Sequence, residues 1–334
     1  MADAAVAHGR IVASTFEPHR WLRGPHAQTI VPSVLRPTPK LALEIETLEL
    51  ADGDFVRVGW AGRVNKLERL AVFIHGLTGG FESKYLRGLA QRLIANHWRV
   101  AILELRGAGP LPNRLPRNYH HGDTGDLRHL WQLLSVRHPG ARIAAVGWSL
   151  GANVLLKALA EEGEHAAPDA AAAVSAPFDL AACAEKLRGG SARIYQGRLL
   201  RDLKRMLVRK YAQMPAPTGV DLAAALRAED FFAFDNAYTA PLHGFADAQD
   251  YYTRCACGSF LAGIRRPTLI VNAADDPFMQ RASIPTATTL APQVTLELAR
   301  RGGHVGFIGS DARGRLDYWL ERRLADWLES VLPA

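Results

Sequence analysis

Cysteine is scarce: the 334 residues contain Cys183, Cys255 and Cys257 and no other. Three thiols in a chain of this length do not form a disulfide framework. Cys255-Ala256-Cys257 also lacks a second cysteine pair that would complete a zinc site. We therefore expect structural thiols in a protein of the reducing cytoplasm, and no bound metal.

Long apolar runs are absent too. No stretch of 18 or more apolar residues occurs, so the sequence predicts no transmembrane helix. Met1–Phe16 lacks the charged start and apolar block of a secretory signal. The apolar fraction of 48% and the charged fraction of 22% are typical of an ordinary globular protein.

Nucleotide and metal motifs are also missing. The glycine-rich segments 76–80 and 106–109 have neither the spacing of a dinucleotide fingerprint nor a P-loop lysine, so we expect no cofactor. His120, His121 and Asp123 suggest a metal site, but a helix start is the preferred interpretation. There, Asp123 or Thr124 would cap the helix and Asp126 would lie in its first turn.

The net charge of +7 is concentrated in one stretch. Between Lys186 and Lys210 there are nine Lys or Arg and a single acid, Asp202. Such a stretch could contact nucleic acid, anionic lipid or an acidic partner. The preferred interpretation is a solvated helix face, and we expect no nucleic-acid partner.

Hydrophobic periodicity indicates an α/β fold. Prolines divide residues 1–40 into short extended pieces, and the alternating segments 41–50 and 55–60 flank an Asp52-Gly53 hairpin signal. Continuous apolar runs then alternate with helical patterns, as in a mostly parallel, doubly wound sheet. Strands are expected at 70–74, 98–103, 142–146, 170–174, 268–272 and 294–298, and helices from 83, over 127–134, after 150 and over 315–332.

The alternation stops over residues 178–263, which are rich in aromatic residues and show no strong strand run. We predict a helical cap at 178–263, inserted into a core made of 1–177, with its N-terminal arm, and 264–334.

The stretch around Ser149 suggests a nucleophile. Gly147-Trp148-Ser149-Leu150-Gly151 lies between an apolar strand and a helix, and a serine at such a sharp turn favours glycine on both sides. A serine hydroxyl needs a base oriented by a carboxylate, and these groups gather at the carboxyl ends of parallel strands. Later strands end in Asp275-Asp276-Pro277 and in Gly302-Gly303-His304, in the order Ser, Asp, His.

We favour Asp276 over Asp275 as the orienting acid because Pro277 fixes the loop behind it. Asp275 would then be a supporting or capping acid. The tetrahedral intermediate also needs two backbone N–H groups. Leu150, after the nucleophile, and Leu77, in the segment His75-Gly76-Leu77-Thr78-Gly79-Gly80, are the candidates for this oxyanion hole. His75, Gly76, Gly147 and Gly151 are expected to support the site.

Six segments carry a family resemblance: His26–Thr29, His75–Gly79, Arg106-Gly107, Gly147–Asn153, Asn272–Pro277 and Gly303–Phe307. With these, nearly the whole chain resembles the α/β-hydrolase fold, and more narrowly the bacterial YheT-like hydrolases and the animal abhydrolase-domain serine hydrolases. The resemblance implies a catalytic triad of Ser149, Asp276 and His304. It also implies hydrolysis of carboxylic esters, with acyl esters or phospholipids as substrates in some members.

Three functions remain open at this stage. The leading hypothesis is a cofactor-free serine esterase acting on small acyl or lipid-like esters through an acyl-enzyme on Ser149. An acyltransferase or thioesterase would use the same triad. The third is a non-catalytic surface-binding protein, in which the basic segment 196–211 lies on anionic membrane with its apolar stripe facing the lipid. That stripe comprises Leu199, Leu203, Met206, Leu207 and Tyr211. Packing of the stripe against the body is the preferred interpretation.

Overall fold

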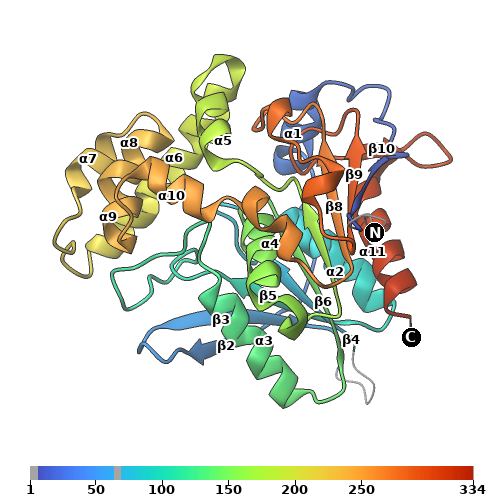
Figure 1. Ribbon diagram of the computed structural model, residues 1–334, viewed down its shortest axis with the longest axis horizontal. Coiled ribbons are helices and arrows are strands. Elements are labelled where there is room, and N and C mark those ends of the chain that lie inside the picture. Colours follow the sequence, from blue (N-terminus) through green and yellow to red (C-terminus); the bar gives the residue numbers. More distant parts are fainter. Residues whose placement is uncertain (1–6, 64–68, 334) are drawn as a thin grey trace, which may run out of the picture.

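A nine-stranded sheet forms the centre of the computed structural model, which describes residues 7–63 and 69–333 (Figure 1). The strands lie in the order β1-β9-β8-β7-β6-β4-β5-β3-β2. They are β1 (Arg10–Ala13), β2 (Glu44–Glu49), β3 (Phe55–Ala61), β4 (Arg69–Ile74), β5 (Arg99–Glu104), β6 (Arg142–Trp148), β7 (Ala170–Val174), β8 (Thr268–Ala273) and β9 (Val294–Ala299).

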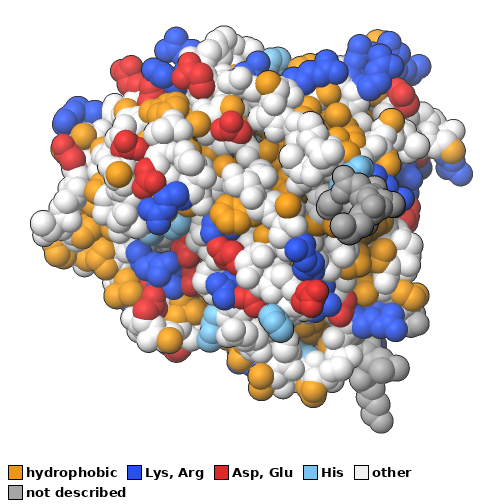
Figure 2. All heavy atoms as spheres, in the orientation of Figure 1, with side chains coloured by type: hydrophobic (Ala, Val, Ile, Leu, Met, Phe, Trp, Pro, Cys, Tyr) orange, Lys and Arg blue, Asp and Glu red, His pale blue; other side chains and the backbone are white. Residues whose placement is uncertain are grey.

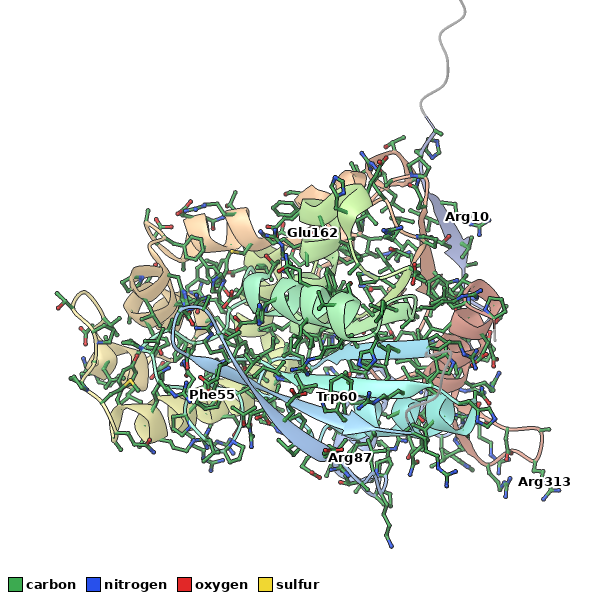
Figure 3. All side chains as sticks on the ribbon, turned by 90° about the horizontal axis from the view of Figure 1, so that it is seen from below. Arg10, Phe55, Trp60, Arg87, Glu162 and Arg313 are labelled. Atoms are coloured by element: carbon green, nitrogen blue, oxygen red, sulfur yellow. The ribbon has the colours of Figure 1, made fainter. Side chains whose placement is uncertain are left out.

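All neighbours from β1 across to β5 pair in parallel, whereas β3 is antiparallel to both β5 and β2. Every residue of β4, β7 and β8 is buried, as expected for strands covered on both faces. The predicted doubly wound sheet and its β2–β3 hairpin are therefore confirmed. Figure 3 shows Arg10 of β1 and Trp60 of β3 toward opposite ends of this sheet.

Helices cover both faces of the sheet. Two of them, α2 and α11, pack on one face around Phe73 and Val146, and α3 and α4 pack on the other around Val72 and Ile74. The amphipathic patterns of these helices match this packing. The helices outside the segment between β7 and β8 are α1 (Pro25–Val34), α2 (Lys84–Ala95), α3 (Gly125–Arg137), α4 (Leu150–Glu162) and α11 (Trp319–Val331), with short 3₁₀ turns η1 (Gly163–His165), η5 (Arg281–Ser283) and η6 (Ala287–Thr289).

Between β7 and β8 the chain is helical and lies beyond one end of the sheet (Figure 1). Most of its buried apolar side chains form a cluster of their own, against which Leu77 and Phe278 pack. We propose that this segment, residues 178–263, is a cap inserted into a core of 1–177 and 264–334; residues 1–6, 64–68 and 334 of that core lie outside the described ranges. The cap contains α5 (Leu180–Arg188), η2 (Gly190–Ala192), α6 (Arg193–Tyr211), α7 (Leu222–Arg227), α8 (Phe231–Phe234), the π-helical turn η3 (Asp235–Thr239), α9 (Ala240–His243), α10 (Ala248–Cys255) and η4 (Cys257–Gly263).

The N-terminal arm differs from the prediction. It is not a series of extended pieces, because residues 25–34 form α1 and residues 10–13 add β1 to the sheet edge. Pro25 occupies the first helical position, where a missing N–H costs nothing, and Pro32 falls in the last turns. The prolines therefore mark where this helix begins and ends.

The start of the last helix was also predicted wrongly. It begins at Trp319, because residues 316–318 form β11 (Leu316–Tyr318), which pairs antiparallel with β10 (Ile308–Ser310). The predicted start of α3 is confirmed with Thr124 at the N-cap position, but neither candidate side chain makes a cap hydrogen bond: Asp123 pairs with Arg117, and the Thr124 hydroxyl donates to Glu161. Asp126 does lie in the first turn.

Candidate active site

Ser149 lies at a strained turn between β6 and α4, with φ of 52° and ψ of −117°. Its neighbours leave no room for side chains. A Cβ at Gly147 would come within 2.3 Å of the Gly151 carbonyl oxygen, and one at Gly151 within 2.2 Å of the Ile74 carbonyl oxygen. The glycines therefore allow the strand-to-helix turn that presents the serine hydroxyl at the carboxyl end of β6.

His304 and Asp276 complete a hydrogen-bonded chain with Ser149. His304 Nε2 lies 2.9 Å from Ser149 Oγ, and Nδ1 lies 2.8 Å from Asp276 Oδ2. The carboxylate can only accept, which assigns the proton to Nδ1 and leaves the Nε2 lone pair for the serine hydroxyl. Residues 149, 276 and 304, predicted from three separate motifs, thus lie within hydrogen-bond reach of one another.

Phe278 fixes the plane of the His304 ring. The two rings stack with centroids 4.0 Å apart and planes 3° apart. The Phe278 N–H also donates to Asp276 Oδ1 at 2.8 Å, so the same turn orients the carboxylate and the aromatic ring. Phe278 in turn packs against Tyr195 of α6. The imidazole is therefore held by both the core and the cap.

Asp275 supports the loop that carries His304. Its Oδ1 accepts a hydrogen bond from the Gly303 N–H at 3.0 Å, whereas its Oδ2 is buried without a hydrogen-bond partner among the described residues. Burial raises the pKa of this carboxyl group. The two adjacent acids thus have different roles: Asp276 contacts the His304 imidazole, and Asp275 contacts the backbone of the loop that carries His304.

Helix α1 also holds the histidine loop, a role that the sequence did not reveal. The Thr29 hydroxyl accepts the His304 N–H at 2.9 Å. Gln28 is fully buried, and its amide group both accepts from the Ile308 N–H and donates to the Ile308 carbonyl. A Cβ at Gly306 would come within 2.1 Å of the Gln28 carbonyl oxygen, so glycine lets the loop lie directly on the helix.

A further contact comes from the end of β7. The Ser175 hydroxyl accepts the Val305 N–H at 3.0 Å, and both residues have positive φ. Non-glycine residues at positive φ are strained and concentrate at functional sites, a signal that is visible in coordinates but not in sequence.

The candidate oxyanion hole lies beside Ser149. A Cβ at Gly76 would come within 3.3 Å of Ser149 Cβ, which brings the segment after β4 against the serine. Neither the Leu77 N–H nor the Leu150 N–H donates to an acceptor in the described parts of the chain, whereas the Gly76 and Thr78 N–H groups donate to Tyr85 and Tyr119. The two predicted donors thus remain available to a ligand.

His75 anchors this segment, and both of its ring nitrogens form hydrogen bonds to backbone groups. It is fully buried, and its Nε2 accepts from the Leu105 N–H while Nδ1 donates to the Gly76 carbonyl oxygen. Burial lowers its pKa to about 4, so the ring stays neutral near pH 7.

Asn153 of α4 joins the cap to the core. Its side chain is fully buried; the amide nitrogen donates to the His121 and Cys255 carbonyls, and the amide oxygen accepts the Cys257 N–H.

The three cysteines form no disulfide. Cys183, Cys255 and Cys257 are buried and unpaired, and burial raises the pKa of each thiol. Within residues 7–63 and 69–333, no cluster of His, Cys, Asp or Glu has the geometry of a metal site.

Arg106 belongs to a buried polar network that reaches α6. Its guanidinium pairs with Asp52, Asp54 and Asp126. Asp54 accepts from Asn113, which in turn accepts from Lys210 Nζ. Burial lowers the Lys210 pKa to about 7. This network ties the end of α6 to the β2–β3 turn.

A cavity of about 430 Å³ connects Ser149 and His304 with the cap. Its volume falls in the usual range of small-molecule sites, about 300–1,000 Å³. Leu180, Leu187, Leu199, Phe231 and Tyr252 line its cap side. Asp235 also lines it, accepts hydrogen bonds from Thr239 and Tyr252, and has a pKa raised to about 6 by burial.

A mostly parallel sheet with a serine turn after β6 and a Ser–His–Asp hydrogen-bond chain is characteristic of the α/β-hydrolase class. The sequence pattern of the family described as alpha/beta hydrolase fold matches residues 71–311. The chain is also 40% identical over 325 residues to the Escherichia coli protein named "Putative esterase YheT", covering 96% of this chain and 95% of that protein. The chain therefore belongs to the α/β-hydrolase fold family, among its YheT-like members, as its motifs predicted.

More distant relatives carry names of lipid-directed enzymes. Phospholipase ABHD3 of Mus musculus is 26% identical, with 90% of this chain and 75% of that protein covered. Among solved structures, the esterase Pf2001 of Pyrococcus furiosus has a TM-score of 0.57 at 14% identity and covers 99% of this chain and 100% of its own. That likeness shows the shared fold. Among the described residues, no helix combines the length and apolarity needed to cross a bilayer.

Proposed function

We propose that the protein is a serine esterase that hydrolyses carboxylic esters with apolar acyl chains through an acyl-enzyme on Ser149. Membership of the family, with a relative named as an esterase, makes the chain a hydrolase of carboxylic esters. The nucleophile, the intermediate and the acyl preference are our proposal. The observation that carries it is the hydrogen-bonded chain from Ser149 through His304 to Asp276.

In the first step, Ser149 Oγ forms a bond to the ester carbonyl carbon while its proton moves to His304 Nε2. The electron pair of the carbonyl π bond moves to the oxygen, which the Leu77 and Leu150 N–H groups stabilise. The carbon–oxygen bond to the alcohol then breaks, and the leaving oxygen takes the proton from Nε2. Asp276 stabilises the imidazolium that forms in between.

In the second step, water attacks the acyl-enzyme. His304 Nε2 takes a proton from the water, and the returning electron pair expels Ser149 Oγ, which recovers that proton. The products are a carboxylic acid and free enzyme, so no cofactor enters the balance.

A fluorophosphonate probe tests the nucleophile because it labels activated serines covalently. We expect labelling of the wild type and none of Ser149→Ala. Ser33→Ala is the matched control, since Ser33 lines the same cavity and lies outside the proposed triad. Equal labelling of the Ser149→Ala variant would refute the assignment.

The apolar lining of the cap side supports medium-length acyl chains as substrates. A series of nitrophenyl esters from acetate to decanoate should show kcat/KM rising toward medium chain lengths, by up to about fourfold for each methylene that the pocket buries, which corresponds to about 0.8 kcal/mol per methylene. A strong preference for acetate would count against an acyl pocket in the cap.

Transfer of the acyl group to an alcohol is a second candidate. A relative of Saccharomyces cerevisiae, 27% identical with 77% of this chain and 61% of that protein covered, is named medium-chain fatty acid ethyl ester synthase/esterase 2. Product analysis in water containing ethanol separates the two functions, because an acyltransferase would yield mainly the ethyl ester.

A further inference from the structure

Helix α1 reverses the usual amphipathic pattern. Its polar residues Gln28 and Thr29 point inward to the His304 loop, and Gln28 is fully buried. Ile30 and Val34 face out, at 41% and 53% exposed, and the adjoining Leu35 is 72% exposed. At helical spacing, Ile30 and Val34 lie on one face, one turn apart. Exposed apolar groups that adjoin in this way indicate an interaction surface.

This face borders the entrance of the cavity that contains Ser149. Ile30 and Ser33 line the cavity and are also exposed to solvent, and so is Arg198 of α6. The entrance therefore has α1 on one side and α6 on another. Hydrogen bonds between His26 and Tyr195 of α6 and between His26 and Ser191 of the preceding turn η2 join the two sides at this point.

The outer face of α6 is basic. Arg193, Arg198 and Arg201 are exposed and form no ion pair within the described parts of the chain, whereas Arg205 pairs with Asp202. Ile194, 72% exposed, lies beside them. On the face drawn in Figure 2, Lys and Arg side chains gather along the edge where α5 and the chain leading into α1 lie, with hydrophobic side chains between them.

The inner face of α6 is already occupied. Leu200 and Leu207 belong to the buried cluster of the cap, and Leu199, Leu203 and Tyr211 pack against it. Met206 of the same stripe belongs to the core cluster, so the apolar stripe that the sequence offered as a lipid contact is packed inside the protein, against cap and core. The apolar part of a membrane contact therefore comes mainly from α1, with Ile194 of α6 beside the arginines.

We propose that the outer faces of α1 and α6 form a docking surface for an anionic lipid membrane, which brings the entrance of the Ser149 cavity to the bilayer. The α1 side chains Ile30, Val34 and Leu35 would enter the boundary between headgroups and acyl chains, and the unpaired arginines would contact anionic headgroups. A second copy of the chain fits less well, because a two-fold interface would bring equal arginine clusters together.

Co-sedimentation with vesicles tests the surface without relying on catalysis. The protein carries Ser149→Ala, so that failure of the esterase proposal leaves the result unaffected. The vesicles contain phosphatidylglycerol and phosphatidylcholine in equal amounts, and pure phosphatidylcholine is the uncharged reference. We expect binding to the anionic vesicles that weakens as NaCl rises from 0.05 to 0.5 M.

Two pairs of variants locate the contact. Arg198→Gln/Arg201→Gln should weaken binding about 25-fold, at about 1 kcal/mol for each arginine. Arg63→Gln/Arg227→Gln removes the same charge from exposed sites after β3 and at the end of α7 and should change binding less than threefold. Val34→Ser/Leu35→Ser should weaken binding at least tenfold. Its control is Val136→Ser, 79% exposed on α3, which lies away from α1 in Figure 1.

Thermal melts accompany each variant, so that weaker binding with an unchanged Tm reports on the surface itself. Equal vesicle binding by all variants would overturn the proposal. So would absence of vesicle binding combined with a concentration-dependent dimer that Val34→Ser/Leu35→Ser dissociates, because the face would then join two copies of the chain.

Discussion

Ser149 and His304 lie 2.9 Å apart but are held in place by different kinds of structure. The serine side is local, since Gly147 and Gly151 permit one turn between adjacent elements. The histidine side is long-range, because the contacts from Thr29 to His304, from Ser175 to Val305 and from Asp275 to Gly303 span 275, 130 and 28 residues. Substitutions of the glycines that flank Ser149 should therefore act mainly through stability. The histidine side should respond mainly through activity.

The largest expected effect is on the histidine side. In Asp276→Asn the amide no longer offers a carboxylate to the His304 Nδ1–H, which favours the wrong tautomer and leaves the imidazolium unstabilised. We expect kcat on a nitrophenyl ester to fall by about 10³–10⁴-fold with little change in Tm. Retention of more than a tenth of the activity would mean that Asp276 does not orient the base.

A substitution at a glycine beside Ser149 should act by lowering the stability of the fold. In Gly151→Ala the new Cβ meets the Ile74 carbonyl oxygen, a backbone atom that cannot move aside cheaply. We expect the free energy of unfolding to fall by about 2–4 kcal/mol in urea titrations. Gly197→Ala on α6 is the control: a Cβ there has no neighbour within 4 Å, and alanine favours the helix. Equal stability of the two variants would contradict tight packing at the strand-to-helix turn of Ser149.

A milder substitution tests whether α1 positions the His304 imidazole without disturbing the fold. Thr29→Val keeps the shape of the side chain but removes the hydroxyl that accepts the His304 N–H. A slightly misplaced imidazole should lower kcat/KM about tenfold, with a loss of stability of about 1 kcal/mol. Thr29→Ser keeps the hydroxyl and should restore most of the activity. If both variants behave like the wild type, α1 does not position the base.

The difference between local and long-range structure also explains what the sequence could predict. Continuous apolar runs identified the parallel strands, and the glycines at 147 and 151 identified the turn, because these signals are local. Asp276 could be preferred to Asp275 from Pro277 alone, and Asp276 is the acid that lies against His304.

The remainder depends on contacts that no short segment encodes. Residues 25–34 were predicted as extended because prolines interrupt them. The helix was also hidden because it buries the polar Gln28 and leaves Ile30 and Val34 exposed, opposite to the usual pattern. The strands β1, β10 and β11 are each only three or four residues long, which is too short for an alternating pattern to be recognised. They form because β1 pairs with the distant β9 and because β10 and β11 pair with each other. The roles of Gln28 and Thr29 could not be predicted either, because they depend on the position of α1.

Asp275 offers the finest test of the comparison, because it lies beside Asp276 yet serves only the loop. Burial raises its folded-state pKa above that of the unfolded chain, so the folded state binds the proton more tightly. Its contribution to stability is therefore largest below the unfolded pKa and is lost as pH rises through the folded pKa. Asp275→Asn keeps an acceptor for the Gly303 N–H and cannot ionise. The variant should gain less than about 1 kcal/mol over the wild type at pH 7, since the group is partly exposed, and this difference should vanish at about pH 3, below the unfolded pKa. Urea titrations at both pH values measure it; a variant that is less stable at pH 7 would show that the loop needs the charge.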